Sequence, residues 1–333
     1  MNCLVISMGG VNARLLSCYG NPVIDTPAID QLAADAFVFD YCFADAVDPA
    51  ASRRALWTGR RQLGPQQTIG LPRTVLIRDT QRLVQPDALP LRVFDEVVDC
   101  DPDRYPAGVE LLAEARRWLR ANSAGAGYLA FVDAWGIHPP HNQDVAAALA
   151  RVDRHLGELF DWLRERSLWD QTLIALTSDV GTVPREQRDS SGHLPIELCD
   201  AAHVPLIVRI PGAHDAAATR TPALVQTVDL LPTMLDAMQL PPAVESAGRS
   251  LLPVVRLAQR KIRDHVLVTS PHSRWVRTRQ WSLVLADASN GGSPARLFAQ
   301  PEDRWEHNDL ASQFPDVVAE LSASARSDPL GDE

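Results

Sequence analysis

Lysine is almost absent from this sequence. Of the 32 lysine and arginine residues in the 333-residue chain, only Lys261 is a lysine. A site built from the N-terminal part of the chain therefore has no lysine to offer, and any mechanism that needs one there is excluded. Arginine carries nearly all of the positive charge.

The chain also lacks an excess of positive charge and a long apolar run. Its formal net charge is −10 and its pI is about 5.4, which argues against a general surface for nucleic acid or anionic membranes. No apolar run approaches the length of a membrane span. We expect no nucleic-acid and no membrane partner, while a local basic pocket for a small anion stays open.

The cysteines form no metal-binding or redox motif. Their number is odd, and none belongs to a CxxC or Cys/His zinc pattern. We expect reduced thiols, mostly in the core, of a cytoplasmic protein whose first strand begins without a signal sequence before it. The five are Cys3, Cys18, Cys42, Cys100 and Cys199.

The sequence does contain apolar strands separated by amphipathic helices. Apolar residues make up 46% of the chain, and the alternation predicts an α/β fold with a large, mostly parallel sheet sandwiched by helices. Thr26 is the expected cap of a helix that has Pro27 at its first position. The predicted strands are 3–8, 37–45, 73–79, 128–135, 172–179 and 204–212. The predicted helices begin at 27, near 51, and at 108, 143 and 227.

The pattern changes after about residue 262. Short strands at close spacing, with "NGG" at 290–292 as a turn, predict a small antiparallel sheet that a helix at about 313–326 closes. We therefore predict an α/β domain over residues 1–262 and a C-terminal antiparallel subdomain over residues 263–333.

The first predicted strand ends without functional side chains. In open α/β sheets the working residues lie just beyond the carboxyl ends of the strands. Met8, Gly9 and Gly10 occupy these positions here. None of the three side chains can coordinate a metal, carry a charge or transfer a proton.

The segments, in their order, resemble the sulfatases of the alkaline phosphatase superfamily over nearly the whole chain. The resemblance rests on "CYGNPVIDTPAIDQLA", "SRRALWTGR", "FVDAWGIHPPH", "TLIALTSDVG" and "HVPLIVRIPG". Each motif alone is weakly specific, whereas the series is specific for the fold. The resemblance implies a hydrolase fold in which a calcium ion and an aldehyde made from cysteine or serine act on a sulfate ester.

The resemblance also implies that most positions of this chemistry have changed. The two adjacent metal-binding aspartates of the family fall on Gly9 and Gly10, and its modified nucleophile falls on Pro49. Asp179 is retained as a metal position, but its neighbour is Val180. Calcium takes about six to eight oxygen ligands, so we expect no cofactor and the loss of the family calcium.

Other family positions are retained or exchanged. His138 matches the strand-end histidine, and the last lysine of the family falls on or beside His193. A further lysine and histidine fall on Asp79 and Gln81. We expect His138 to be a relic at a strand end rather than an acid–base group.

Arg53 matches the arginine of the family signature. It can bind an anion near a helix N-terminus, or it can pair with Asp179 or Asp48 as a structural residue. We favour the structural role.

We expect a sulfatase-like protein that is catalytically inactive, a pseudo-sulfatase with a binding, scaffolding or regulatory role. Its partners would be a small anion near Arg53, His138 and His193, a second copy of the chain, or an active sulfatase relative. The alternative is a sulfuric- or phosphoric-ester hydrolase with a rebuilt active site. In that case Asp48, Asp79 and Asp179 could hold a different metal. A purely structural subunit is the third possibility.

Overall fold

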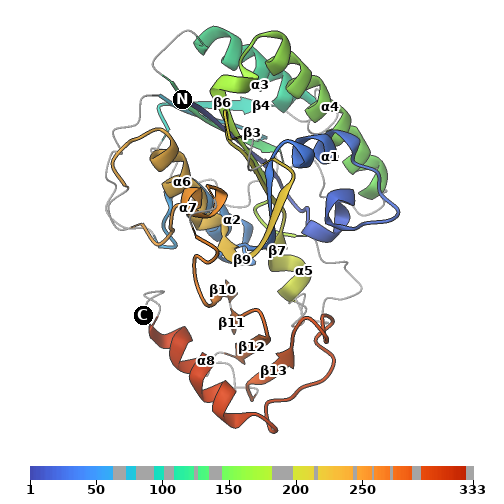
Figure 1. Cartoon of the computed structure of the whole chain (residues 1–333), viewed down its shortest axis with the longest axis vertical. Helices are drawn as coiled ribbons and strands as arrows, with labels where there is room; N and C mark the ends of the chain where they lie inside the picture. The colour runs from blue at the N-terminus through green and yellow to red at the C-terminus, as the bar shows by residue number, and fades with distance from the viewer. Residues whose placement is uncertain are drawn as a thin grey trace.

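The structure is a computed structural model with a large sheet and a small sheet (Figure 1). In the described residues no helix has both the length and the apolar character of a membrane span. Those residues are 1–62, 73–79, 94–100, 109–123, 127–134, 145–181, 198–213, 217–242, 246–256, 259–270, 273–286 and 294–327.

The large sheet has nine strands and is mostly parallel, as predicted. They are β1 (Asn2–Met8), β2 (Phe37–Phe43), β3 (Thr74–Asp79), β4 (Glu96–Cys100), β5 (Leu129–Ala134), β6 (Thr172–Thr177), β7 (His203–Val204), β8 (Leu206–Arg209) and β9 (Thr219–Gln226). Their order is β4-β3-β5-β1-β6-β8-β2-β7, with β9 paired to β2. β1 lies parallel between β5 and β6, whereas β8 runs antiparallel to β6 and β2.

Helices cover both faces of this sheet. One face packs against α1 (Pro27–Ala34), α3 (Val109–Asn122) and α4 (Val145–Glu165), and the other against α2 (Pro49–Thr58), α6 (Leu230–Ala237) and α7 (Leu252–Val255). The side chains of β1 alternate between the two cores, with Leu4 and Ile6 on the first and Cys3 and Val5 on the second. A strand buried on both faces reads as an unbroken apolar run. Shorter helices are η1 (Ala13–Leu15), η2 (Ser17–Tyr19), η5 (Trp169–Gln171), α5 (Leu198–Ala202) and η8 (Thr227–Asp229).

The small sheet is antiparallel, as predicted. It consists of β10 (Val266–Ser270), β11 (Ser273–Arg277), β12 (Trp281–Ala286) and β13 (Arg296–Ala299), and α8 (Pro315–Ser327) packs on β11 and β12. The turn expected at 290–292 lies outside the described residues. The predicted domain boundary falls between α7 and β10 and stays a prediction.

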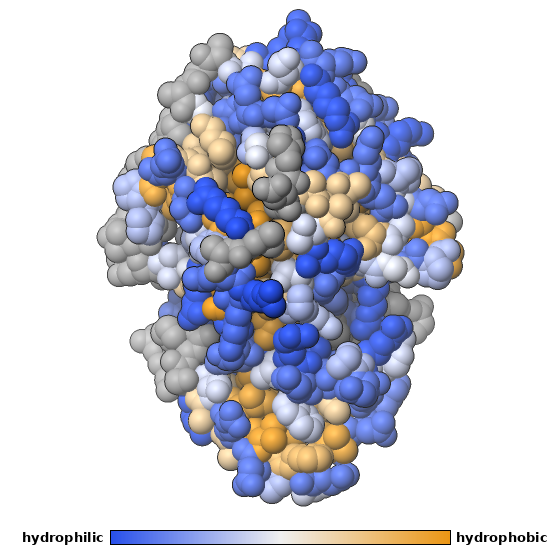
Figure 2. Space-filling view, in the orientation of Figure 1, coloured by the Kyte–Doolittle hydropathy of each residue, from blue (hydrophilic) through white to orange (hydrophobic). Residues whose placement is uncertain are grey.

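The surface in the same orientation is mostly hydrophilic (Figure 2), in keeping with the net charge of −10. Apolar residues gather at its lower end, where Figure 1 places the small sheet and α8. In the small sheet, the rings of Trp281 of β12 and Phe314, which immediately precedes α8, are tilted against each other with their centroids 5.1 Å apart.

The helix α1 begins at Pro27 with Thr26 as its N-cap residue, as predicted, but the Thr26 hydroxyl lies 2.6 Å from Ser17 Oγ and makes no capping hydrogen bond to α1. The carboxylate of Asp153 on α4 instead accepts from the amides at the start of α1. α2 begins at Pro49, slightly earlier than predicted, because Asp48 is its N-cap and accepts from the Ala51 amide at 2.7 Å.

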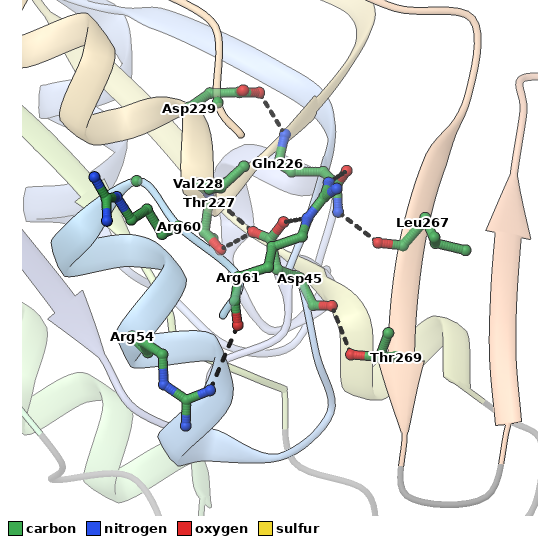
Figure 3. Close-up of polar contacts among 12 residues, drawn as sticks. Asp45, Arg54, Arg60, Arg61, Gln226, Thr227, Val228, Asp229, Leu267 and Thr269 are labelled. Atoms are coloured by element: carbon green, nitrogen blue, oxygen red, sulfur yellow. Dashed lines mark hydrogen bonds and ion pairs between the residues drawn. The ribbon is translucent and has the colours of Figure 1, made fainter. Parts of the chain in front are cut away.

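A buried polar network joins the two sheets (Figure 3). Asp45 accepts hydrogen bonds from Arg61 Nε at 2.8 Å and from the Val228 amide at 2.9 Å. Arg61 Nη2 also donates to Gln226 Oε1 at 2.6 Å, and Gln226 Nε2 donates to the Leu267 carbonyl of β10 at 2.9 Å. The side chains of Arg61 and Asp45 are 9% and 2% exposed, so water screens this ion pair little.

A second pair extends the network. Arg263 pairs with Asp229, and its Nη1 donates to Gln226 Oε1 at 3.0 Å. Burial raises the pKa of Asp229 above its ordinary value, although Arg263 and two backbone amides oppose the shift. Each buried carboxylate of the network therefore has an arginine beside it.

Replacement of Asp45 tests how much this network contributes to stability. Asp45→Asn leaves Arg61 as a buried charge without its anion, so we expect the free energy of unfolding to fall by about 3 kcal/mol. Urea denaturation measures the change. Asp161→Asn is the matched control, because Asp161 is 71% exposed in its ion pair with Arg164. We expect the control to stay within about 0.5 kcal/mol of the wild type, and equal effects of the two substitutions would contradict a stabilising role of the buried pair.

Candidate functional site

The candidate site lies where α2 meets the carboxyl ends of the central strands. Asp48 caps α2, Pro49 occupies its first turn, and Gly59 ends it with φ +67°. Pro49 fits this position because an amide in the first turn has no carbonyl partner within the helix. The absence of an N–H group on proline therefore costs no hydrogen bond. These local signals fix which side of α2 faces the sheet, and Ser52 and Arg53 lie on that buried side.

Arg53 bridges two aspartates from neighbouring parts of the sheet. Its Nε lies 3.0 Å from Asp133 Oδ2, and its Nη2 lies 2.9 Å from Asp179 Oδ2. The three side chains are 2%, 4% and 0% exposed. A guanidinium group buried this deeply requires paired anions. Of the two partners expected for Arg53, the structure shows the pair with Asp179 and adds Asp133, while the role of Arg53 stays a prediction.

Asp179 is held tightly just beyond β6. Its Oδ1 accepts from the Val180 amide at 2.7 Å and lies 3.4 Å from the Gly10 amide. Its backbone carbonyl accepts from Ser52 Oγ at 2.5 Å. Gly10 adopts φ +87°, a left-handed conformation that favours glycine. Gly10 therefore lets the backbone after β1 approach Asp179 directly.

Asp133 differs from Asp179 in its hydrogen bonds. Asp133 ends β5, and its Oδ1 is buried without a hydrogen-bond partner in the part of the chain that the structure describes. Burial raises the pKa of Asp133 from 3.8 to about 6, Arg53 opposes this shift, and the nearby Asp179 adds to it. Asp133 can therefore gain or lose a proton close to neutral pH.

Asp133 belongs to a polar row across the sheet. In the strand register it lies beside Ser7 of β1 and Arg78 of β3, and parallel neighbours in register point to the same face. Arg78 Nε donates to Asp99 Oδ1 at 2.7 Å. Ser7 Oγ and Arg78 Nη1 are buried without hydrogen-bond partners among the described residues. Three adjacent strands thus each present a polar atom that a small bound molecule could contact.

Asp133, Ser7 and Arg78 are not among the residues predicted from the sequence. Asp133 follows four apolar strand residues in "LAFVDA", and a charge at the end of a fully buried strand was the signal that could have identified it. Arg78 gives the same signal in β3, whereas Ser7 is an uncharged polar residue near the end of the buried strand β1. What the sequence could not show is that the register places the three side by side.

Of the other predicted site residues, some lie on the elements that form the site and others lie outside the described residues. Pro49 lies in the first turn of α2, Val180 follows Asp179, and Asp79 is buried at the end of β3. His138, His193 and Gln81 lie outside the described residues. Within the described ranges, no three His, Cys, Asp or Glu side chains are grouped so that they could hold a metal ion, and the predicted cluster of Asp48, Asp79 and Asp179 is not among them.

Comparisons with known proteins agree with this architecture. The Sulfatase family model matches residues 103–240, a span that includes Asp133 and Asp179. Arylsulfatase K of Gallus gallus is 33% identical over 198 residues, which are 54% of this chain and 35% of that protein. Arylsulfatase K of Homo sapiens is 27% identical over 197 residues, with 54% and 35% covered. The chain therefore aligns with about a third of the length of these curated relatives.

Solved structures share the fold over almost the whole chain. The phosphonate monoester hydrolase of Agrobacterium radiobacter has a TM-score of 0.76 at 18% identity, covering 98% of this chain and 95% of its own. BT1596, a 2-O GAG sulfatase, has a TM-score of 0.76 at 18% identity, covering 98% and 91%. At this identity the likeness shows the fold alone. It confirms the predicted sulfatase-like α/β architecture.

The expectation of no cofactor is wrong. The chain matches the Sulfatase model and arylsulfatases, and this family uses calcium, so the loss of calcium is unsupported. The described residues supply Asp133 and Asp179 as buried carboxylates at the strand ends, and both pair with Arg53. This set falls short of the six to eight oxygen ligands that calcium takes. By themselves the described residues do not fit the ion, and we derive no chemical step through it.

Asp133 makes the stability of the fold depend on pH. The pKa of Asp133 is raised in the folded state. The stabilisation that Asp133 gives the fold is therefore largest below pH 3.8 and is lost as the pH rises to about 6. We expect the free energy of unfolding of the wild type, relative to Asp133→Asn, to fall by about 3 kcal/mol across this range. Chemical denaturation at a series of pH values measures it.

Arg53→Gln serves as the matched variant for this test. Without the guanidinium group, nothing replaces the attraction of Arg53 for the ionised carboxylate of Asp133, and the pKa of Asp133 should rise further. The loss of stability should then occur at a higher pH than in the wild type. If Asp133→Asn and the wild type have parallel pH profiles, the raised pKa of Asp133 is refuted.

Proposed function

We propose that this chain is a non-hydrolytic member of the sulfatase family, within the alkaline phosphatase superfamily, and that it binds an anionic ligand instead of cleaving a sulfate ester. The observation that carries the proposal is the pair of residues Pro49 and Arg53 in α2. Its first turn has Pro49 where the family alignment expects a modified cysteine or serine, and its Arg53 is committed to Asp133 and Asp179. A proline has no nucleophilic atom and cannot become the aldehyde that attacks sulfur.

The same pairing determines when an anion can bind. With both carboxylates ionised, the charge of Arg53 is more than compensated, and the local field repels anions. When Asp133 takes up a proton, one of the two negative charges disappears and Arg53 becomes available to an anion. The proposed binding state is therefore the one with Asp133 protonated.

Three further parts of the proposal rest on the sequence. His138 and His193 are the proposed additional contacts of the anion. A second copy of the chain or an active sulfatase relative is a proposed macromolecular partner of this scaffolding or regulatory role. A cytoplasmic location is proposed from the cysteine pattern.

A second candidate function is an ester hydrolase with a rebuilt site. Two observations favour it, namely the relatives that are named arylsulfatases and the pKa of Asp133 of about 6, which suits a general base near neutral pH. Ser7 and Arg78 in the same row would belong to such a site.

Turnover measurements distinguish the two candidates. With calcium supplied, we expect the purified protein to release no aryl alcohol from an aryl sulfate or an aryl phosphate above the rate of an Arg53→Gln preparation, because the position of the nucleophile is a proline. Chromogenic esters report the rate directly.

Asp133→Asn is the second control for turnover. A wild-type rate that both substitutions abolish would overturn the non-hydrolytic proposal and support the rebuilt hydrolase. Equal rates in all three preparations indicate a contaminating activity and leave no turnover to explain.

Anion binding has its own pH signature. We expect inorganic sulfate or phosphate to bind more tightly below pH 6 than above it, because protonation of Asp133 (pKa about 6) frees Arg53. Asp133→Asn should bind the anion with similar affinity on both sides of that pH, and Arg53→Gln should lose binding throughout. Isothermal titration calorimetry measures the affinity of the wild type and of both variants. An affinity that changes neither with pH nor with the loss of Arg53 would contradict the proposal.

A further inference from the structure

The turn between β13 and α8 contains a buried carboxylate that the strand-end site does not use. Ser282 Oγ of β12 donates to Glu306 Oε1 at 2.6 Å, and Trp275 Nε1 of β11 donates to Ser282 Oγ at 2.5 Å. Glu306 Oε2 is buried without a hydrogen-bond partner among the described residues. Glu306 also adopts φ +57°, which few residues other than glycine do. The carboxylate is therefore built into the small sheet through a chain of two hydrogen bonds.

The surroundings of Glu306 bring its pKa close to neutral pH. Burial raises the pKa of Glu306 from 4.5 to about 7. The hydrogen bond from Ser282 and the charges of Arg277 of β11 and Arg296 of β13 oppose the shift, and Asp303 of the same turn adds to it. Asp303 also holds the turn, because its carboxylate accepts from the amides of His307 and Asn308 at 3.0 and 2.8 Å. The ionised form of Glu306 is thus the disfavoured one in the closed turn.

The same turn contacts the large sheet beside the candidate site. Trp305 is 51% exposed, and the guanidinium carbon of Arg14 lies 4.8 Å from the centre of its ring. Arg14 belongs to η1, four residues after Gly10, and pairs with Asp200 of α5 at 2.6 Å. An arginine over an indole ring at this distance is a cation–π contact. Residue 305 therefore joins the small sheet to the segment that follows β1.

We propose that Glu306 is a proton-operated latch, which holds Trp305 against Arg14 while its carboxyl is protonated and releases that contact when it ionises. The protonated carboxyl keeps the hydrogen bond from Ser282 without a buried net charge. Ionisation places a charge in a site that water does not reach, and the turn relieves this by opening toward solvent. The contact between the small sheet and η1 is consequently closed at low pH and open at high pH.

Quenching of Trp305 fluorescence by acrylamide tests the latch. The contribution of Trp305 is the difference between the wild type and Trp305→Phe, measured in the full chain from well below to well above pH 7. We expect this residue to become more accessible to the quencher with a midpoint near the Glu306 pKa of about 7. Glu306→Gln, which is neutral at every pH, should keep Trp305 at the low-pH accessibility of the wild type throughout.

Two further variants make the test decisive. Glu302→Gln removes an exposed carboxylate from the same turn and should keep the wild-type midpoint. Arg14→Gln removes the cation that η1 supplies, whereas Arg304 of the turn itself keeps its guanidinium carbon 4.4 Å from the centre of the Trp305 ring. This variant should leave Trp305 equally accessible at every pH, and the readout stays informative if Glu306→Gln folds poorly. A flat wild-type profile, or an unchanged midpoint in Glu306→Gln or Arg14→Gln, overturns the latch.

Discussion

The ion pairs of Arg53 with Asp133 and Asp179 are the constraint on which the rest of the site depends. A buried guanidinium group without partners would be very unfavourable, so the ends of β5 and β6 and the middle of α2 are fixed relative to one another by these contacts. Asp48 and Gly59 set where α2 begins and ends, and thereby which residue reaches the aspartates. The glycines after β1 then let the backbone close over Asp179, whose carboxylate accepts from the amide of Val180.

The scarcity of lysine has a structural counterpart in how the buried charges are satisfied. Arg61 contacts both Asp45 and Gln226, and Arg209 reaches Asp35, Asp170 and the Trp169 carbonyl at once. The guanidinium group carries five donors in a planar arrangement, so one buried side chain can contact several acceptors from different elements. In this fold arginine therefore serves as the connector between elements, and the junction of the two sheets and the candidate site use the same device.

The sequence predicted the central strands well, because burial on both faces makes them continuous apolar runs, as in β1 and β6. It missed β9, whose Pro222 and polar residues do not look like a strand, although pairing with β2 alone tolerates a proline. It also missed the partner of Arg53 on β5 and the Asp153 cap of α1, since each joins residues far apart in the chain. Local patterns specify elements, whereas the partners of a buried charge follow from the packing of those elements. The expectation about calcium went wrong for a related reason, because it was drawn from single aligned positions.

The balance of charge at the strand ends explains why Asp133, and not its neighbour, is the residue that exchanges a proton. Two guanidinium groups, those of Arg53 and Arg78, act on Asp133 against the carboxylates of Asp179 and Asp79, so the ionised form of Asp133 leaves an excess of negative charge that burial makes unfavourable. Asp179 accepts from the amide of Val180, with the Gly10 amide 3.4 Å away, in addition to its contact with Arg53, and protonation would weaken these interactions. The Oδ1 atom of Asp133 accepts from none of the described residues, so a proton there disrupts least and removes the excess charge. The proton thus occupies a buried oxygen for which the described residues provide no hydrogen-bond donor.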